Sequence, residues 1–193
     1  LMGVYGYALQ IYCDFSGYSD MAIGIALLLG FRFPKNFDSP YKSATITEFW
    51  RRWHISLSAW LKDYLYISLG GNRKGRFRTY VNLVVTMLLG GLWHGAALRF
   101  ILWGGFHGVL LALHKFLMRL FPRMKVVGAD MKRGWRVAGI VVTFHLVCLG
   151  WIFFRARDVG TGVEILEQVF TNFDVSLIPN IVVGYWEIFA LML

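Results

Sequence analysis

The sequence has almost no cysteine. Cys13 and Cys148 are its only two, and each lies inside an apolar run. A disulfide framework and a cysteine-based zinc site are therefore excluded, and no metal site is predicted. Each thiol is expected to be a small buried side chain.

Charged residues, and acids above all, are also scarce. Only 16% of the 193 residues are charged, with 11 acids against 20 Lys and Arg, whereas 57% are hydrophobic and the mean hydropathy is +0.54. Apolar runs of about 20 residues are long enough to cross a bilayer. This composition indicates a membrane protein and argues against a soluble domain.

The basic residues fall in two blocks between the apolar runs. Residues 32–78 hold ten Lys or Arg against three acids, and residues 115–136 hold seven against one. Nucleic-acid-binding modules instead gather basic residues on one face of a folded domain, so no nucleic-acid partner is expected. Loop charges of this kind follow the positive-inside rule, which predicts that both blocks face the cytoplasm.

The apolar pattern predicts an all-α, multi-pass transmembrane protein with interfacial or re-entrant helices. Residues 1–31 are mostly apolar, and a helix break is expected near Gly17, beside Asp14 and Asp20. Acids are costly to expose to lipid, so both should face a protein interior or an aqueous cavity. Residues 32–42, with two prolines, read as a loop.

Thr45 and Glu48 form the pattern of a capping box, which predicts the start of a helix. That helix is expected to continue to Leu69 as an interfacial helix. Three further elements are expected: a helical hairpin over residues 80–113, a span over 135–154, and a short helix at 163–170 in a polar connector over 155–180. Within the hairpin, Gly90-Gly91 and Gly104-Gly105 offer places to break or to pack tightly.

Five histidines lie in or beside these runs, and an ionisable group in a membrane is a functional hypothesis by default. His94 stands between Trp93 and Gly95, with Gly90-Gly91 just before, so a substrate can approach its ring closely while water is kept out. A neutral imidazole in a dry pocket suits the general base of an acyl transfer. The alternative is a core histidine bonded to a neighbouring carbonyl.

His54 follows Arg51 and Arg52 on the aromatic side of its helix. One interpretation is a histidine that orients a substrate, with arginines that hold the phosphates of a nucleotide-bearing donor. The other is anchoring of Trp and Arg at the headgroup level of a membrane. The spacing does not decide between them.

Other functional classes stay open from the residues alone. His107, His114 and His145 are compatible with haem ligation in an electron carrier, or with structural hydrogen bonds. Asp14 and Asp20 are compatible with a proton relay or with capping of a helix break. A transporter or channel in which these acids and the histidines line a path is therefore the alternative to an enzyme.

Six strings follow one another along the chain: Asp14–Gly24, Pro34–Phe37, Phe49–Ser58, Asp63–Ile67, Gly70–Arg73 and Gly91–Ala96. In order and spacing they resemble the membrane-bound O-acyltransferase (MBOAT) family, and most of all its bacterial alginate O-acetyltransferase branch. The resemblance covers residues 5–174, and its most specific strings are Arg52-Trp53-His54 and Trp93-His94-Gly95.

The resemblance implies an O-acyltransferase with a thin core pierced by a tunnel, which takes the donor from the cytoplasm and the acceptor from outside. The family's essential histidine maps onto His94 and its second histidine onto His54, and these are the expected catalytic residues. The residues expected to bind substrate are Asp14, Ser16, Arg51, Trp53 and Trp93.

The resemblance also implies acetyl-CoA or another acyl thioester as the donor substrate, with no bound cofactor. The acyl group is expected to be acetyl and to reach an exported polysaccharide, as in alginate biosynthesis, through periplasmic acetylation partner proteins at the bacterial inner membrane. Residues 1–193 are expected to be one partial domain, its central and C-terminal part without the N-terminal helices. Arg99 departs from the family pattern and places a charge near the expected site.

Overall fold

The computed structural model describes residues 1–121 and 132–172, which form helices and connecting segments without a β-strand. In chain order the elements are α1 (Met2–Leu28), η1 (Pro40–Lys42), α2 (Ile46–Arg52), α3 (Ile55–Trp60), η2 (Leu61–Tyr66), α4 (Arg76–Trp93), α5 (Leu98–Leu120), α6 (Arg133–Arg155) and α7 (Val159–Thr171). Here η1 is a short 3₁₀ helix and η2 a π-helical stretch. The all-α prediction is confirmed for this part of the chain.

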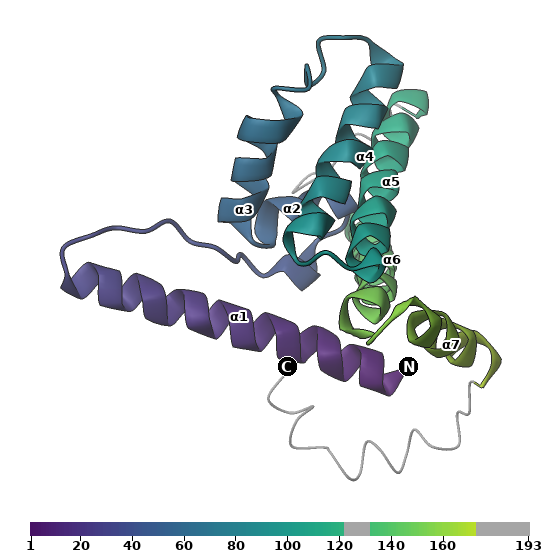
Figure 1. The fold of residues 1–193 in the computed structure, drawn as a ribbon, viewed down its shortest axis with the longest axis horizontal. Helices are drawn as coiled ribbons and strands as arrows, with labels where there is room; N and C mark the ends of the chain where they lie inside the picture. Colours follow the sequence, from purple (N-terminus) through teal and green to yellow (C-terminus); the bar gives the residue numbers. More distant parts are fainter. Residues whose placement is uncertain (122–131, 173–193) are drawn as a thin grey trace.

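Helices α4, α5 and α6 form one packed group, and α1 lies across the end of it (Figure 1). Helix α6 contacts α5, α1 and α7, so it joins the group to the crossing helix. The far end of α1 projects away from the other helices, and the segment that follows it returns toward α2 (Figure 1). The site described below lies where α1 crosses the group.

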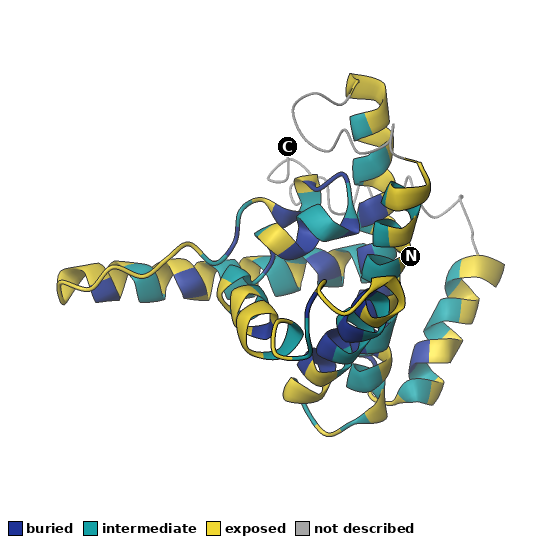
Figure 2. Ribbon diagram, turned by 90° about the horizontal axis from the view of Figure 1, so that it is seen from above, coloured by how far each residue is buried: buried dark blue, intermediate teal, exposed yellow. Residues whose placement is uncertain are grey.

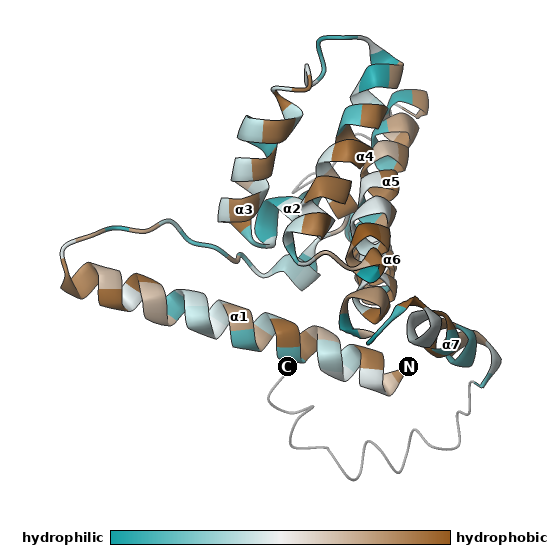
Figure 3. Cartoon of the chain, viewed as in Figure 1, coloured by the Kyte–Doolittle hydropathy of each residue, from teal (hydrophilic) through white to brown (hydrophobic). Residues whose placement is uncertain are grey.

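Two of the described helices are long and apolar enough to cross a membrane. Helices α5 and α6 have 23 residues each and mean hydropathies of 1.4 and 2.2 in their most apolar stretches. At a rise of 1.5 Å per residue such a helix is about 35 Å long, which exceeds the roughly 30 Å of a hydrocarbon core. Helix α6 contains the span predicted over residues 135–154. Hydrophilic residues gather instead at the turn that leads into α4 (Figure 3).

Helices α4 and α5 form the predicted hairpin, with its turn at residues 94–97. The glycine pairs serve close packing, and neither breaks a helix. A Cβ atom on Gly91 would meet the carbonyl oxygen of Phe100, and one on Gly104 would meet that of Met87. The two backbones approach this closely because neither glycine has a Cβ atom, as in other membrane helix pairs.

Helix α1 is uninterrupted, so the break expected near Gly17 is wrong. The first proline of the chain is Pro34, so each amide within α1 can donate to the carbonyl four residues earlier. A Cβ atom on Gly17 would meet nothing within 4 Å, and Asp14 and Asp20 are both exposed. The acids therefore do not force a bend. Asp20 does not take the enclosed position expected for it.

The helix expected from Thr45 begins as predicted. The Thr45 Oγ1 accepts a hydrogen bond from the N–H of Glu48 at 3.1 Å, and the Glu48 carboxylate accepts one from the N–H of Ala44 at 2.9 Å. The reciprocal bond thus reaches one residue further back than in the usual capping box. The cap fixes where α2 starts.

The same helix does not continue unbroken to Leu69, which corrects that prediction. The N–H of Asp38 donates to the carbonyl of Arg52 at 2.9 Å, and the N–H of Ile55 donates to the carbonyl of Asn36 at 2.9 Å. These bonds occupy groups that a continuous helix would pair internally. The chain is therefore helical on both sides of the break, and Trp53 and His54 lie within it.

The core where α1, α2, α5 and α6 meet is rich in aromatic residues. Figure 2 shows the buried residues gathered in the middle of the molecule. Phe49 stacks on Trp53 with ring centroids 5.6 Å apart, and Trp53 packs on Trp151 at 5.0 Å. Trp103 stacks on Trp151 at 6.0 Å, and all four side chains are buried. Aromatic pairs at such distances contribute about 0.5–1.5 kcal/mol each beyond the burial of their surface. This core holds the break between α2 and α3 against α5 and α6.

Three smaller predictions concern the rest of the chain. Helix α7 contains the short helix expected at residues 163–170, and the end of its connector, 173–180, lies outside the described residues. The basic block at 115–136 lies partly outside them as well. Cys148 is buried as expected, but Cys13 is exposed, because no described helix covers its part of α1.

Replacing Gly104 by alanine should destabilise the protein by about 1–3 kcal/mol, because the new Cβ atom would force α4 and α5 apart. Thermal unfolding of the full-length protein in detergent measures the effect. Gly17→Ala in α1 is the matched control, and it should leave the midpoint unchanged or raise it. Equal midpoints for the two variants would contradict the proposed role of the glycine contact.

Candidate active site

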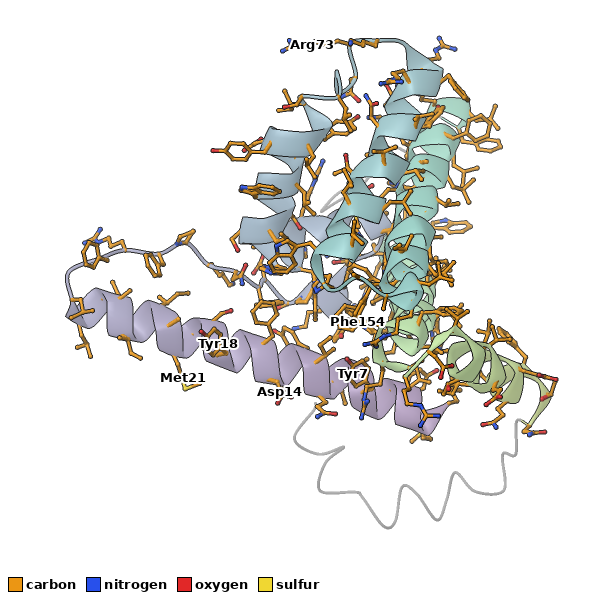
Figure 4. The ribbon with its side chains drawn as sticks, viewed as in Figure 1. Tyr7, Asp14, Tyr18, Met21, Arg73 and Phe154 are labelled. Atoms are coloured by element: carbon orange, nitrogen blue, oxygen red, sulfur yellow. The ribbon has the colours of Figure 1, made fainter. Side chains whose placement is uncertain are left out.

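His54 and His94 line one open cavity of about 450 Å³ beside α1. The other lining residues are Tyr7, Gln10, Ile11, Asp14, Phe15, Tyr18, Trp93 and Phe154. Figure 4 labels Tyr7, Asp14 and Tyr18 on α1 and Phe154 near the end of α6, far from Arg73 at the opposite end of the hairpin. The cavity therefore lies between α1 and the ends of α4 and α6.

A second, more enclosed chamber of about 50 Å³ lies behind this cavity. Both spaces share His54, His94, Ile11, Phe15 and Phe154 as lining residues. The rest of the chamber wall is apolar or aromatic and consists of Trp50, Trp53, Leu57, Trp103 and Trp151. The two histidines thus stand at the junction between a larger open space and a small, more enclosed apolar one.

His94 is the residue that follows α4, where its N–H donates to the carbonyl of Gly91 at 3.0 Å. Its ring meets Trp93, Trp103 and Phe154 with centroid distances of 5.0, 5.2 and 5.0 Å. Among the described residues, the imidazole of His94 has no hydrogen-bond partner. Its nitrogens therefore remain available to a substrate.

His54 lies between α2 and α3 with a left-handed backbone, at a φ of 43°. Its Nδ1 lies 3.2 Å from the Oδ1 of Asn36, and Phe15 meets its ring edge-on at 4.7 Å. The ring of Trp93 is 6.3 Å away. Contacts from α1, from the segment before η1 and from the end of α4 thus fix this ring.

Both rings are neutral at pH 7. Burial lowers the pKa of His94, and burial followed by the charge of nearby His94 lowers the pKa of His54 to about 4. Both residues lie outside the two candidate spans α5 and α6. A neutral imidazole has a lone pair that can accept a proton from a hydroxyl group, as a general base requires.

The other expected site residues divide into two groups. Asp14 and Trp93 line the open cavity, and Trp53 is a buried core residue that lines the inner chamber. Ser16 and Arg51 line neither space. Arg51 is exposed. The transporter alternative needs both acids along one path, but only Asp14 lines the cavity and Asp20 does not.

Sequence reasoning missed several residues at this site. Tyr7, Gln10, Asp14 and Tyr18 follow one another at spacings of three and four, which places them on one face of α1. That spacing was the signal that could have grouped Tyr7, Gln10 and Tyr18 with Asp14. No local pattern pointed to Phe154, which reaches the cavity from a distant helix.

The remaining histidines have separate surroundings. His107 is fully buried against Trp50 and Trp103, and neither of its ring nitrogens has a partner among the described residues. The Nδ1 of His114 lies 2.7 Å from the Thr47 Oγ1, and the Nε2 of His145 lies 2.6 Å from the Tyr5 hydroxyl. The described residues contain no cluster of three or more His, Cys, Asp or Glu that could hold a metal ion. These contacts favour structural roles over paired haem ligation.

Arg99 has a structural position. Its guanidinium donates to the carbonyls of Phe154 and Ala156 at 2.8 and 2.7 Å, and it lies over the ring of Phe100 at 4.1 Å. Those carbonyls end α6, where unpaired acceptors and the helix dipole both favour a cation. The charge expected near the site therefore caps a helix and does not line the cavity.

Comparison with known proteins gives one matching family. The sequence model of MBOAT, the membrane-bound O-acyltransferase family, matches residues 1–155. The chain is 54% identical over 171 residues to "Probable alginate O-acetylase AlgI" of Pseudomonas aeruginosa, which covers 88% of this chain and 31% of the relative. It is 43% identical over 171 residues to a peptidoglycan O-acetyltransferase of Helicobacter pylori, covering 89% of this chain and 31% of that protein.

A more distant relative has a different name. The chain is 32% identical over 164 residues to a teichoic acid D-alanyltransferase of Bacillus subtilis, covering 81% of this chain and 41% of that protein. The chain spans about a third of the length of several curated relatives that it matches.

Replacing His107 by phenylalanine should leave the melting temperature of the full-length protein unchanged or raise it. The ring would keep its aromatic contacts and lose two buried nitrogens whose lack of partners costs about 1–3 kcal/mol. The matched change His145→Phe removes bonds to Tyr5 and to the Val141 carbonyl, and it should lower the melting temperature. If His107→Phe is the more destabilising of the two, His107 has a polar partner after all.

Proposed function

Because the chain belongs to the membrane-bound O-acyltransferase family, we propose that its protein transfers an acyl group from a thioester donor to a hydroxyl group, with His94 as the general base. One observation carries the proposal. His94, directly after α4, and His54, in the break between α2 and α3, both line the open cavity and the more enclosed chamber. A reaction between two substrates that enter from different sides needs such a junction.

The proposed reaction uses the neutral ring of His94. The imidazole accepts the proton of the acceptor hydroxyl while the hydroxyl oxygen attacks the thioester carbonyl carbon. The tetrahedral intermediate then breaks its carbon–sulfur bond. The leaving thiolate takes the proton from the imidazolium, which gives an ester and a thiol and restores neutral His94. The aromatic rings around His94 exclude water, which would compete with the acceptor.

The inner chamber supports a short acyl group as the cargo. Its volume of about 50 Å³ is far below the roughly 300–1,000 Å³ of pockets that enclose larger ligands. An acetyl group therefore suits this space better than a fatty acyl chain. We assign acetyl-CoA or another short acyl thioester as the donor on this basis.

The names of the relatives support the choice of acceptor. They are named for O-acetylation of alginate or peptidoglycan and for D-alanylation of teichoic acid, all of which are polymers. We propose an exported polysaccharide as the final acceptor, reached through periplasmic partner proteins, and a multi-pass location in the bacterial inner membrane. Asp14 and Trp93 in the open cavity are the proposed acceptor-side contacts.

His94→Ala in the full-length protein should lower acyl transfer by about 10² to 10⁴, the usual cost of removing a general base. The measurement is the acyl content of the exported polymer, with membrane insertion checked in parallel. His145→Ala, outside the cavity, is the control and should retain transfer. Undiminished acylation in a folded His94→Ala protein would rule out the assigned base.

Leu57→Ala should relax the choice of acyl group, because Leu57 closes part of the inner chamber. The rate with butyryl thioester relative to acetyl thioester should rise about tenfold, since one or two methylenes in an apolar pocket change selectivity by that order. Leu65→Ala, a half-buried leucine outside the chamber, should leave the ratio unchanged. An unchanged ratio in Leu57→Ala would place the acyl group elsewhere.

A further inference from the structure

Asn36 connects three parts of the structure through one side-chain amide. It lies in the segment between α1 and η1, and its Nδ2 donates to the Ser19 Oγ on α1 at 3.2 Å. Its Oδ1 accepts from the Ser56 N–H at 3.2 Å and from the Ser56 Oγ at 3.0 Å. The same oxygen lies 3.2 Å from the Nδ1 of His54. A single loop residue thus bonds to α1, to the start of α3 and to one candidate catalytic ring.

The orientation of this amide follows from its partners. A backbone N–H can only donate, so the atom that faces the Ser56 N–H must be the oxygen of Asn36. An amide oxygen can only accept, so the nitrogen of His54 that faces it must have the proton. The Ser56 hydroxyl uses its proton on the same oxygen and lies 3.4 Å from that nitrogen as an acceptor. The contacts therefore agree on one tautomer.

We propose that Asn36 is a positioning residue that holds His54 in the tautomer with its proton on Nδ1 and its lone pair on Nε2. This inference rests on the proposed function, in which His54 acts beside His94. The Nε2 then accepts a hydrogen bond from a hydroxyl group next to the reacting one on the acceptor, so that the reacting hydroxyl faces His94 with its own proton free for transfer. Phe15 and Phe37, with ring centroids 4.7 and 6.4 Å from that of His54, keep the ring from turning.

The surroundings of His54 make its protonation state sensitive to position 36. The titratable groups that line the same cavity are His94 after α4 and, on α1, Asp14, Tyr7 and Tyr18. The amide of Asn36 contacts Nδ1 directly and is neutral. A carboxylate at the same place would stabilise the imidazolium form and raise the pKa of His54 from about 4.

Asn36→Asp in the full-length enzyme tests the proposal through the pH profile of acyl transfer. The variant keeps the acceptor for Ser56, so the start of α3 is preserved. The acid limb of the profile should move to higher pH by about one to three units, the usual effect of an adjacent opposite charge. At high pH the variant should recover the wild-type turnover number. If Asn36 had only a structural role, the substitution would not move the acid limb of the pH profile while leaving the turnover number at high pH intact.

Ser19→Ala is the control, because it removes only the bond to Nδ2 and should leave the profile in place. An unchanged profile in Asn36→Asp would overturn the proposal. If Asn36→Asp does not insert into the membrane, ¹⁵N spectra of histidine in the wild-type protein give the same answer, with the His54 signal identified by its loss in His54→Ala. A proton on Nε2 would overturn the proposal, and a proton on Nδ1 supports it.

The activity of His54→Ala distinguishes a failure of the proposed reaction from a failure of the role proposed for Asn36. Full activity in that variant would remove His54 from the proposed reaction, and the positioning role of Asn36 with it. Lost activity in His54→Ala together with an unmoved profile in Asn36→Asp would reject Asn36 alone.

Discussion

The close backbone contact between α4 and α5 is the constraint on which the candidate site depends. Gly91 and Gly104 lie opposite each other, and the two helices meet without intervening side chains. His94 follows Gly91 by three residues, and Trp103 precedes Gly104 by one. The contact that joins the helices therefore also sets the 5.2 Å separation of the His94 and Trp103 rings. The packing of the hairpin therefore also determines where the proposed base lies.

A second constraint brings His54 to the same place. The segment before η1 bonds to both sides of the break between α2 and α3, and the aromatic core holds this break against α6. His54 thus comes from a loop that depends on long-range hydrogen bonds, whereas His94 comes from a local helix pair. The cavity forms because α1 crosses both this loop and the helix pair. Each histidine can therefore be perturbed without dismantling the element that holds the other.

The sequence predicts those features that local physical patterns decide. Apolar runs gave the hairpin and the span of α6, and the Thr45–Glu48 pair marked the start of α2. The break at Trp53 was not predictable from periodicity, because bonds from Asp38 and Asn36, distant in sequence, cause it. The break expected in α1 was wrong because a lone exposed glycine does not interrupt a helix that lacks proline. Their flanking residues made His94 and His54 separate candidates, and only the family resemblance paired them, since no local spacing brings together residues forty positions apart.

The left-handed backbone at His54 has a conformational cost. Within the described residues, only Ser39 and His54 are non-glycine residues with a positive φ. Such a conformation costs an L-residue about 1–2 kcal/mol, and glycine would adopt it without this penalty. Selection for stability alone would thus favour glycine at this position. The histidine at this position thus carries a conformational cost that glycine would avoid, and its ring lines both the open cavity and the inner chamber.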